Sequence, residues 1–220
     1  LMFVRQPLDR ILCLDVGQGD GLCILGEKGG TILVDGGSSD VKKVYQYRIE
    51  PMLKYYGNRK IDAWFLTHGD YDHVSGLEEA LESGRIPIKR VILPEVYGDE
   101  TLDEMRELAE EKQVPVSVIR PGDQLKAGNF RMTSLYPKAE WCSGDKNNDS
   151  LVLSLTRMVG EKEFTMLLMG DLEKKGETVL LEKVGVPDCD VLKVAHHGSS
   201  GATSEAFLEA ARPEWAFISC

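Results

Sequence analysis

Apolar residues recur along this 220-residue chain in short runs that glycines and polar residues separate. Short apolar runs bounded by glycine predict strands, whereas apolar residues spaced three or four positions apart predict helices. The expected strands cover residues 10–16, 22–25, 31–34, 63–66, 90–93, 114–119, 130–136, 151–156, 164–169, 191–194 and 215–219. The expected helices cover residues 51–57, 74–83, 102–112, 172–184 and 205–211, the last with Ser204 as its N-cap.

Strands and helices alternate in two similar halves, which fits two packed sheets with helices on their outer faces. The predicted fold class is therefore α/β, an αββα sandwich of two mixed sheets. With 220 residues, 42% of them hydrophobic, the chain can bury one sizeable core, most simply as a single domain over residues 1–220. No apolar run approaches the ~20 residues that a membrane-spanning helix needs.

Four metal-ligand side chains follow the expected strand 63–66 within seven residues: His68, Asp70, Asp72 and His73. In an extended turn, residues two apart point the same way, so His68 and Asp70 can share one ion. Asp72 and His73 then face a neighbouring ion. Mixed imidazole and carboxylate ligands suit zinc, manganese or iron rather than calcium. The alternative is a polar surface loop that holds these residues by chance.

Three further segments place ligand-type residues directly after an expected strand: Asp35 after strand 31–34, Asp171 after strand 164–169 and Gly170, and His196 and His197 after residues 191–195. Strand-end residues from separate strands are a usual way for a rigid scaffold to gather one site. The two carboxylate oxygens of Asp171 suit it to bridge two ions. Taken alone, Asp171 is more simply the N-cap of helix 172–184, and only the other candidate ligands favour the metal role.

Several motifs, in order along the chain, resemble the metallo-β-lactamase fold, beginning with His-x-Asp-x-Asp-His at residues 68–73 together with Asp171 and His196. Three phrases are more similar to the C-terminal hydrolase domains of the ComEC family of competence DNA-internalization proteins. They are Leu14-Asp-Val-Gly-Gln-Gly-Asp20, Val34-Asp-Gly-Gly37 and Val191-Leu-Lys-Val-Ala-His-His-Gly-Ser199. The resemblance covers nearly the whole chain.

The resemblance implies two divalent metal ions, manganese or zinc. It assigns His68 and Asp70 to the first ion, assigns Asp72, His73 and His196 to the second, and lets Asp171 bridge them. His197 is then expected behind the ligands or on a substrate phosphate. The candidate catalytic residues are Asp70, Asp171 and His197.

Six further residues are expected behind the ligands or against the substrate: Asp35, Gln18, Asp20, Asn148, Lys193 and Ser199. Asp35 resembles a carboxylate that orients a ligating histidine by accepting its other N–H. Gln18 and Asp20 fit a plain hairpin turn equally well. Lys193 could meet a phosphate, although a lysine on a strand more simply faces solvent.

Many members of the wider superfamily supply a further histidine to the first ion from a middle strand. Here that region reads Asn147-Asn-Asp-Ser150. Asn148 or Asp149 could take the place of the histidine, but amide oxygens are weak ligands for zinc. A site rich in carboxylate and poor in imidazole shifts the preference toward manganese.

The resemblance implies a metal-dependent nuclease that hydrolyses DNA phosphodiester bonds and degrades the non-transforming strand during competence DNA uptake. It also implies a fragment of a larger membrane protein that lacks its C-terminal end. The membrane channel domain of that parent protein is then a partner, and the domain, soluble as a fragment, lies at the cell membrane outside the cytoplasm. A hydrolase of a small ester or phosphodiester and a catalytically silent binding module stay open as alternatives.

The net charge of −10 is unfavourable for a nucleic-acid enzyme, because phosphate binding normally requires a basic face. Bound divalent ions would offset several carboxylates. Six basic residues also cluster within twenty positions: Lys42, Lys43, Arg48, Lys54, Arg59 and Lys60. This cluster fits a solvated helix face as well as a phosphate-binding one. No groove-reading motif is present, so DNA is expected to bind through its phosphates without sequence preference.

The five cysteines are odd in number and have no C-x-x-C spacing. They predict neither a disulfide framework nor a cysteine zinc site.

Overall fold

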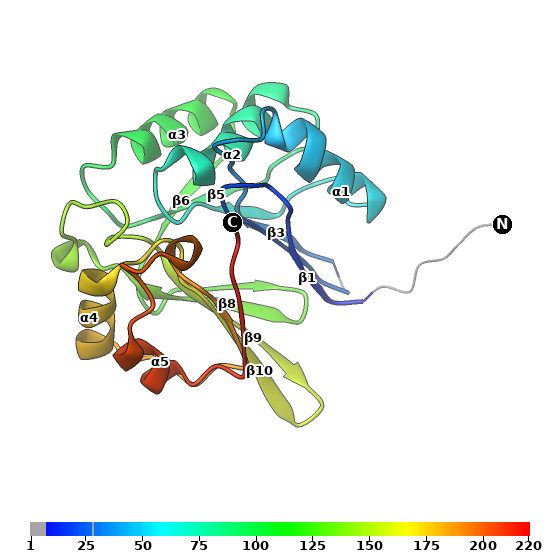
Figure 1. Ribbon diagram of the computed structural model, residues 1–220. Coiled ribbons are helices and arrows are strands. Elements are labelled where there is room, and N and C mark those ends of the chain that lie inside the picture. Colours follow the sequence, from blue (N-terminus) through cyan, green and yellow to red (C-terminus); the bar gives the residue numbers. More distant parts are fainter. Residues whose placement is uncertain (1–7, 28) are drawn as a thin grey trace.

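The computed structural model describes residues 8–27 and 29–220, so the first seven residues of the expected domain lie outside it. Two six-stranded sheets pack face to face, and helices cover both outer faces (Figure 1). The αββα sandwich of two mixed sheets expected from the sequence is confirmed. Among the described residues no helix combines the length and apolar character needed to cross a membrane.

The first sheet has the strands in chain order: β1 (Arg10–Cys13), β2 (Gly21–Leu25), β3 (Thr31–Asp35), β4 (Ala63–Phe65), β5 (Val91–Pro94) and β6 (Val116–Ile119). The pairs from β1 to β3 are antiparallel, and those from β3 to β6 are parallel. Its outer face carries η1 (Tyr45–Ile49), α1 (Glu50–Tyr55), α2 (Tyr71–Ser83) and α3 (Glu100–Glu111).

The second sheet has the order β12 (Trp215–Phe217), β11 (Val191–Lys193), β10 (Lys162–Leu168), β9 (Val152–Val159), β8 (Phe130–Tyr136) and β7 (Gln124–Ala127). Its strands pair antiparallel from β7 to β10 and parallel from β10 to β12. Its outer face carries α4 (Lys174–Lys183) and α5 (Glu205–Ala211). Two short 3-10 turns, η2 (Ala139–Trp141) and η3 (His196–Gly198), complete the chain.

Both faces of the sheets are buried, because one face meets the other sheet and the opposite face meets helices. Along β2 and β3, Ile24 and Ile32 belong to the core between the sheets, whereas Cys23 and Leu33 belong to the core under the helices. A third core joins the second sheet to α4 and α5. Successive side chains of a strand point to opposite faces, so such strands read as continuous apolar runs.

Most element boundaries lie within a few residues of the expected ones, and three departures stand out. Helix α2 begins at Tyr71 rather than Val74, and α4 begins at Lys174 with Glu173 as its N-cap. Asp171 is therefore not the cap of α4. The edge strand β7 was not expected, since only two of its four residues are apolar.

The parallel strands position the functional residues. Strands β3 and β4 run side by side and end at Asp35 and Phe65, while β10 and β11 end at Leu168 and Lys193. The carboxyl ends of neighbouring parallel strands meet at one edge of a sheet. The loops that leave these four strands therefore converge, and they carry the candidate ligands.

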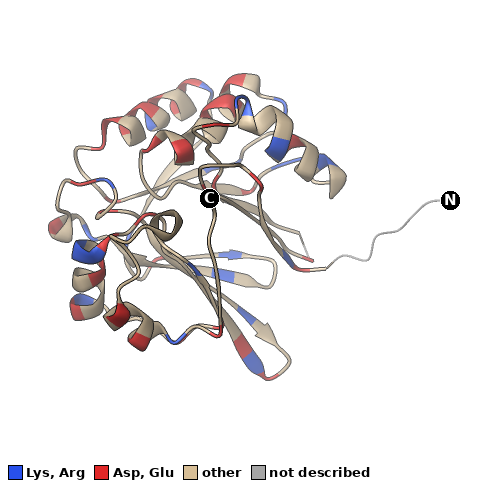
Figure 2. Cartoon of the chain, in the orientation of Figure 1, with Lys and Arg blue, Asp and Glu red and all other residues tan. Residues whose placement is uncertain are grey.

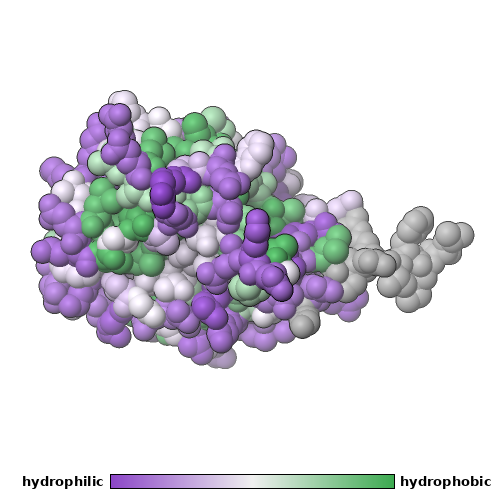
Figure 3. All heavy atoms as spheres, turned by 90° about the horizontal axis from the view of Figure 1, so that it is seen from below, coloured by the Kyte–Doolittle hydropathy of each residue, from purple (hydrophilic) through white to green (hydrophobic). Residues whose placement is uncertain are grey.

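The surface is mixed in character. Viewed from below, hydrophilic residues cover most of the described surface and apolar residues form separate patches (Figure 3). The five cysteines are free thiols, two of them buried.

Candidate metal centre

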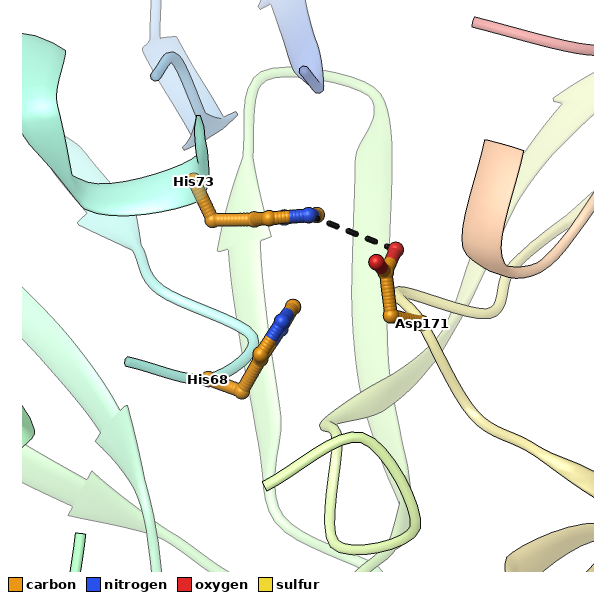
Figure 4. A group of neighbouring side chains, drawn as sticks. All are labelled: His68, His73 and Asp171. Atoms are coloured by element: carbon orange, nitrogen blue, oxygen red, sulfur yellow. Dashed lines mark ion pairs between the residues drawn. The ribbon is translucent and has the colours of Figure 1, made fainter. Parts of the chain in front are cut away.

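Side chains from both sheets meet at the converging strand ends. The loop after β4 and the first turn of α2 supply His68, Asp72 and His73, and the loop after β10 supplies Asp171. Figure 4 shows the rings of His68 and His73 directed toward Asp171, with the ion pair between His73 and Asp171 marked. The Nε2 atom of His73 lies 3.3 Å from Oδ1 of Asp171.

His73 is held from behind by Asp35. Its Nδ1 lies 3.0 Å from Oδ2 of Asp35, and its ring is fully buried. The backbone N–H and the hydroxyl of Thr67 also donate to this carboxylate, each at 2.8 Å. A carboxylate behind Nδ1 fixes the proton there and leaves the Nε2 lone pair for an electrophile. Asp35 thus occupies the orienting position expected for it.

Thr67 orients His68 in the same way. The Thr67 hydroxyl donates its hydrogen to Asp35. The Thr67 oxygen can therefore only accept a hydrogen bond from Nδ1 of His68, 3.0 Å away. The Nε2 atom of His68 then carries the free lone pair. It lies 3.6 Å from Oδ2 of Asp70.

The two consecutive histidines after β11 face different partners. Nε2 of His197 lies 3.3 Å from Oδ2 of Asp72 and 3.3 Å from Oδ2 of Asp171. Nε2 of His196 lies 3.9 Å from Asp171, and its Nδ1 lies 3.1 Å from Glu173. Among the described residues, His197 rather than His196 is grouped with Asp72 and His73. The sequence led us to expect His196 in that group.

The backbone explains this arrangement. His196 and His197 both adopt positive φ angles, 47° and 52°. This left-handed conformation is uncommon for residues other than glycine and turns the chain sharply. The Nδ1 of His197 then donates to the backbone oxygen of Ser219 at 2.9 Å, which fixes the ring with Nε2 toward the carboxylates.

Four buried polar atoms at this point have no hydrogen-bond partner among the described residues. They are Nε2 of His68, Nε2 of His73, Nε2 of His197 and Oδ1 of Asp171. Buried polar atoms are nearly always satisfied, so a cluster of unsatisfied ones calls for an absent ion or water. Three sets of three ligand atoms lie within 4.8 Å of one another: His68, His73 and Asp171; Asp72, His73 and His197; and Asp20, Asp35 and His73. The residues present fit a divalent metal centre.

The charges of the cluster also favour a bound cation. Burial raises the pKa of Asp171, but the neighbouring His197 and His73 outweigh it and hold this pKa well below its usual range. Burial lowers the pKa of His197, yet Asp171 and Asp72 raise it to about 10. The carboxylates thus favour positive charge at this point, and a bound cation would supply it.

Asp70 lies at the edge of the cluster, with its side chain 42% exposed. It belongs to none of the groups of three ligands found among the described residues. The ammonium of Lys146, 3.6 Å from its Oδ1, is the neighbouring cation.

Asn148 and Asp149 do not replace the missing histidine. The amide oxygen of Asn148 accepts from the backbone N–H of Gly176 at 3.0 Å, and its nitrogen donates to Asp145 at 3.1 Å. The carboxylate of Asp149 accepts from the backbone N–H groups of Ser143 and Gly144, both at 2.7 Å. Both side chains hold their own loop together.

Asp20 and Lys193 pair with each other in the interior. The expectation that Lys193 faces solvent is wrong, because its side chain is only 8% exposed. Gln18 is exposed, and its backbone bonds to Asp40 and Ser39. The hydroxyl of Ser199 accepts from the backbone of Gly201 and lies outside the ligand groups.

Sequence reasoning missed four residues that shape the site: Thr67, Lys146, Glu173 and Ser219. Thr67 stands inside the main motif, so its place between two ligands was a usable signal. The other three come from distant segments, and no motif in the surrounding sequence indicates that they lie at the site.

Residues 16–138 match the Metallo-beta-lactamase superfamily. The chain is 33% identical to ComE operon protein 3 of Bacillus subtilis (strain 168), in an alignment that covers 94% of this chain and 27% of that protein. It is 31% identical to competence protein ComA of Neisseria gonorrhoeae, over 79% of this chain and 22% of that protein. The chain thus spans about a quarter of the length of these relatives.

Solved structures share the fold at lower identity. A B3 metallo-β-lactamase with an active-site glutamic acid has a TM-score of 0.57 and 18% identity, over 90% of this chain and 82% of that one. CmlA, a diiron β-hydroxylase from Streptomyces venezuelae, has a TM-score of 0.56 and 16% identity, over 96% of this chain and 45% of that one. At these identities the likeness concerns the fold alone.

Proposed function

This chain belongs to the metallo-beta-lactamase superfamily, and we propose that it is a metal-dependent hydrolase domain that cuts DNA phosphodiester bonds. The name of the relative in Neisseria gonorrhoeae, competence protein ComA, connects that protein with competence. We extend the proposal to that setting: the domain degrades the non-transforming strand beside the membrane channel domain of a longer parent protein.

The convergence of four unsatisfied buried atoms on one point is the observation that carries the proposal. We assign His68 and Asp70 to one ion. We assign Asp72, His73 and His197 to the other, with His197 in the role that we expected for His196. Asp171 would serve both ions, because it is grouped with His68 and lies 3.3 Å from the rings of His73 and His197.

Divalent ions held there would supply hydroxide near neutral pH, since a bound ion lowers the pKa of water to about 7, and would offset charge on the phosphate. The chain's own residues prepare the site. Asp35 and Thr67 fix the ring orientations of His73 and His68, and Ser219 fixes that of His197. Preorganised ligands avoid a reorganisation cost when the substrate arrives.

The surface charge favours a second candidate, the hydrolysis of a small ester or phosphodiester. Acidic and basic residues are interspersed on the outer helices (Figure 2). Within the basic cluster, Lys54 pairs with Glu50 and Lys60 with Asp62, which fits a solvated face rather than a continuous phosphate track. A net charge of −10 suits a small substrate better than a long polyanion.

One assay separates these functions. Purified protein is incubated with labelled single- and double-stranded DNA and, in parallel, with a small phosphodiester and a small carboxylic ester, across Mn²⁺, Zn²⁺ and Mg²⁺. We expect metal-dependent DNA cleavage that falls to background in His68→Ala, Asp72→Ala and Asp171→Ala. Asp188→Ala is the matched control, because this carboxylate is 62% exposed and its ion-pair partner among the described residues is Arg212. Cleavage that persists in all three site variants would show a contaminant and remove the assignment.

A further inference from the structure

A cleft opens beside His68, between the loop that follows β5 and the loop that precedes β9. Residues 96–99 form one wall, and Gly144, Lys146 and Asp149 form the other. Its enclosed volume is about 10 Å³, far below the roughly 300–1,000 Å³ of sites that enclose drug-sized ligands. A ligand here would therefore lie along the rim of the cleft, with only a small group inside it.

Tyr97 presents an aromatic ring at this cleft. Its side chain is 73% exposed, more than any other large apolar or aromatic side chain described. No ring of another described residue stacks on it. A ring that contributes nothing to the core, at the rim of a cleft beside a candidate active site, is available to stack on a flat ligand.

Lys146 supplies a tethered cation in the same cleft. Its ammonium donates to the backbone oxygen of Gly69 and to the hydroxyl of Thr101, both at 3.1 Å. An ammonium has three donors, so one remains. The nearest oxygens of Asp70 and Asp99 lie 3.6 Å and 3.7 Å away, beyond hydrogen-bond distance. The side chain is 38% exposed, which leaves the third donor accessible to an anion.

The acidic residues of the cleft are occupied by the protein. Asp99 accepts from the backbone N–H groups of Gly69 at 2.9 Å and Leu102 at 3.2 Å. The carboxylate of Asp149 is held by its own loop, as described above. Both are buried, at 7% and 5% exposure. Lys146 is therefore the charged group of the cleft wall that is open to a ligand.

We propose that this cleft binds one unpaired nucleotide of a nucleic-acid strand, with its base stacked on Tyr97 and an adjoining phosphate on Lys146. The inference rests on the proposed function, because it places the next phosphodiester bond beside His68. Stacking on an aromatic side chain tolerates any base, so the cleft adds affinity without reading sequence.

The cleft discriminates single strands from duplex. A base in a duplex is already stacked and paired, and extruding it costs a few kcal/mol. A single strand or a frayed end presents its bases without that cost. The substrate class is therefore an unpaired strand.

Binding can be measured apart from cleavage. A fluorescein-labelled short oligothymidylate with hydrolysis-resistant phosphorothioate linkages is titrated with the full chain in Mn²⁺ by fluorescence anisotropy, beside a blunt duplex of equal length. Tyr97→Ala should weaken binding of the single strand roughly 5- to 150-fold, the equivalent of about 1–3 kcal/mol for one stacked base. Tyr97→Phe keeps the ring and should bind as the wild type does. Lys146→Ala should reduce the slope of log K against log salt by about 0.7, the loss of one phosphate contact.

Two variants elsewhere serve as controls. Tyr47→Ala removes an aromatic side chain that is 57% exposed on η1, and Lys162→Ala removes an exposed charge at the start of β10. Both should bind as the wild type does.

The inference fails if Tyr97→Ala matches Tyr47→Ala, if the duplex binds as tightly as the single strand, or if the wild type binds neither. Binding that depends on Tyr97 in a protein that does not cut DNA would keep this inference and remove the proposed nuclease. DNA cleavage by a protein whose binding does not depend on Tyr97 would keep the proposed nuclease and remove this inference.

Discussion

Asp20 and Lys193 form a buried ion pair across the interface between the two sheets, although 173 positions separate them in the sequence. Their side chains are 5% and 8% exposed, and the ammonium of Lys193 also lies 3.4 Å from the backbone oxygen of Gly170. Gly170 precedes Asp171, and Oδ1 of Asp20 lies 3.9 Å from Nδ1 of His197. The pair thus connects the loop before β2 to two segments that carry candidate ligands.

Breaking this pair from one side should be costly. Lys193→Met leaves the buried Asp20 carboxylate without its partner, so we expect a loss of about 3–5 kcal/mol in the free energy of unfolding. The double variant Asp20→Leu/Lys193→Met removes both charges and should lose less than the sum of the single variants. Urea denaturation of the four proteins measures this coupling. Strictly additive losses would show that the two groups stand apart in solution.

The two histidines after β11 should differ in metal binding. His197→Ala removes the Nε2 atom that lies 3.3 Å from both Asp72 and Asp171, so this variant should lose most of its bound metal. His196→Ala removes a ring whose Nδ1 faces Glu173 and should retain the metal. Metal content per chain after dialysis, by inductively coupled plasma mass spectrometry, decides between them. The opposite result would restore the order expected from the sequence.

The proposed sites should fill in steps. Asp72, His73, His197 and Asp171 offer two imidazoles and two carboxylates to one ion, whereas the other has only His68, a half-exposed Asp70 and the shared Asp171. We expect a tight and a weak step in calorimetric titration of Mn²⁺. Asp70→Ala should remove the weak step and leave the tight one. Loss of the tight step in this variant would contradict the ligand count.

Binding of DNA should depend on salt and hardly on base composition. The described residues contain none of the groove-reading motifs, so affinity comes from phosphates and from stacking. Affinity for oligonucleotides of different composition, at matched length and salt, should agree closely, and each should fall as salt rises. A strong preference for one sequence at fixed salt would refute this.

Glu50 should contribute to the pH dependence of stability. Hydrogen bonds from Lys54 and then Arg85 lower the pKa of this buried carboxylate below its ordinary value. A depressed folded-state pKa stabilises the fold above the pKa of the unfolded chain, about 4.3. That stability is lost as pH falls through the folded-state pKa. The free energy of unfolding of Glu50→Gln should therefore be about 1 kcal/mol lower than that of the wild type at neutral pH. This difference between the two proteins should vanish in acid.

The matched urea series for Glu50 is run at neutral and acidic pH. A difference between wild type and Glu50→Gln that is unchanged in acid would mean that the charge of Glu50 is not its source.

The place of the candidate site was readable because the motifs follow strands. Asp35, the stretch from His68 to His73, and Asp171 each stand directly after an apolar run, and parallel neighbours bring such ends together. The same logic gave the two-sheet architecture, since runs buried on both faces alternate with helical periods. These features are local in the sequence, so local patterns could reveal them.

What the sequence could not show depends on distant partners or on backbone angles. Lys193 reads as a solvated strand lysine until Asp20 is placed beside it. The choice between His196 and His197 depends on two positive φ angles that no residue type at those positions requires. The short edge strand β7 has too few apolar residues to be predicted from the sequence, and its pairing with β8 defines it.

The division of the ligands between the two sheets governs when an ion can act during folding. His68, Asp72 and His73 come from the first sheet, while Asp171 and His197 come from the second, so neither half alone offers a complete set. An ion therefore gains its full set of contacts only after the two halves have docked. Where the two halves dock after the rate-limiting barrier, contacts with the ion are absent from the transition state, so they slow unfolding and leave the folding rate unchanged. Metal would then prolong the lifetime of the native chain without guiding the path toward it.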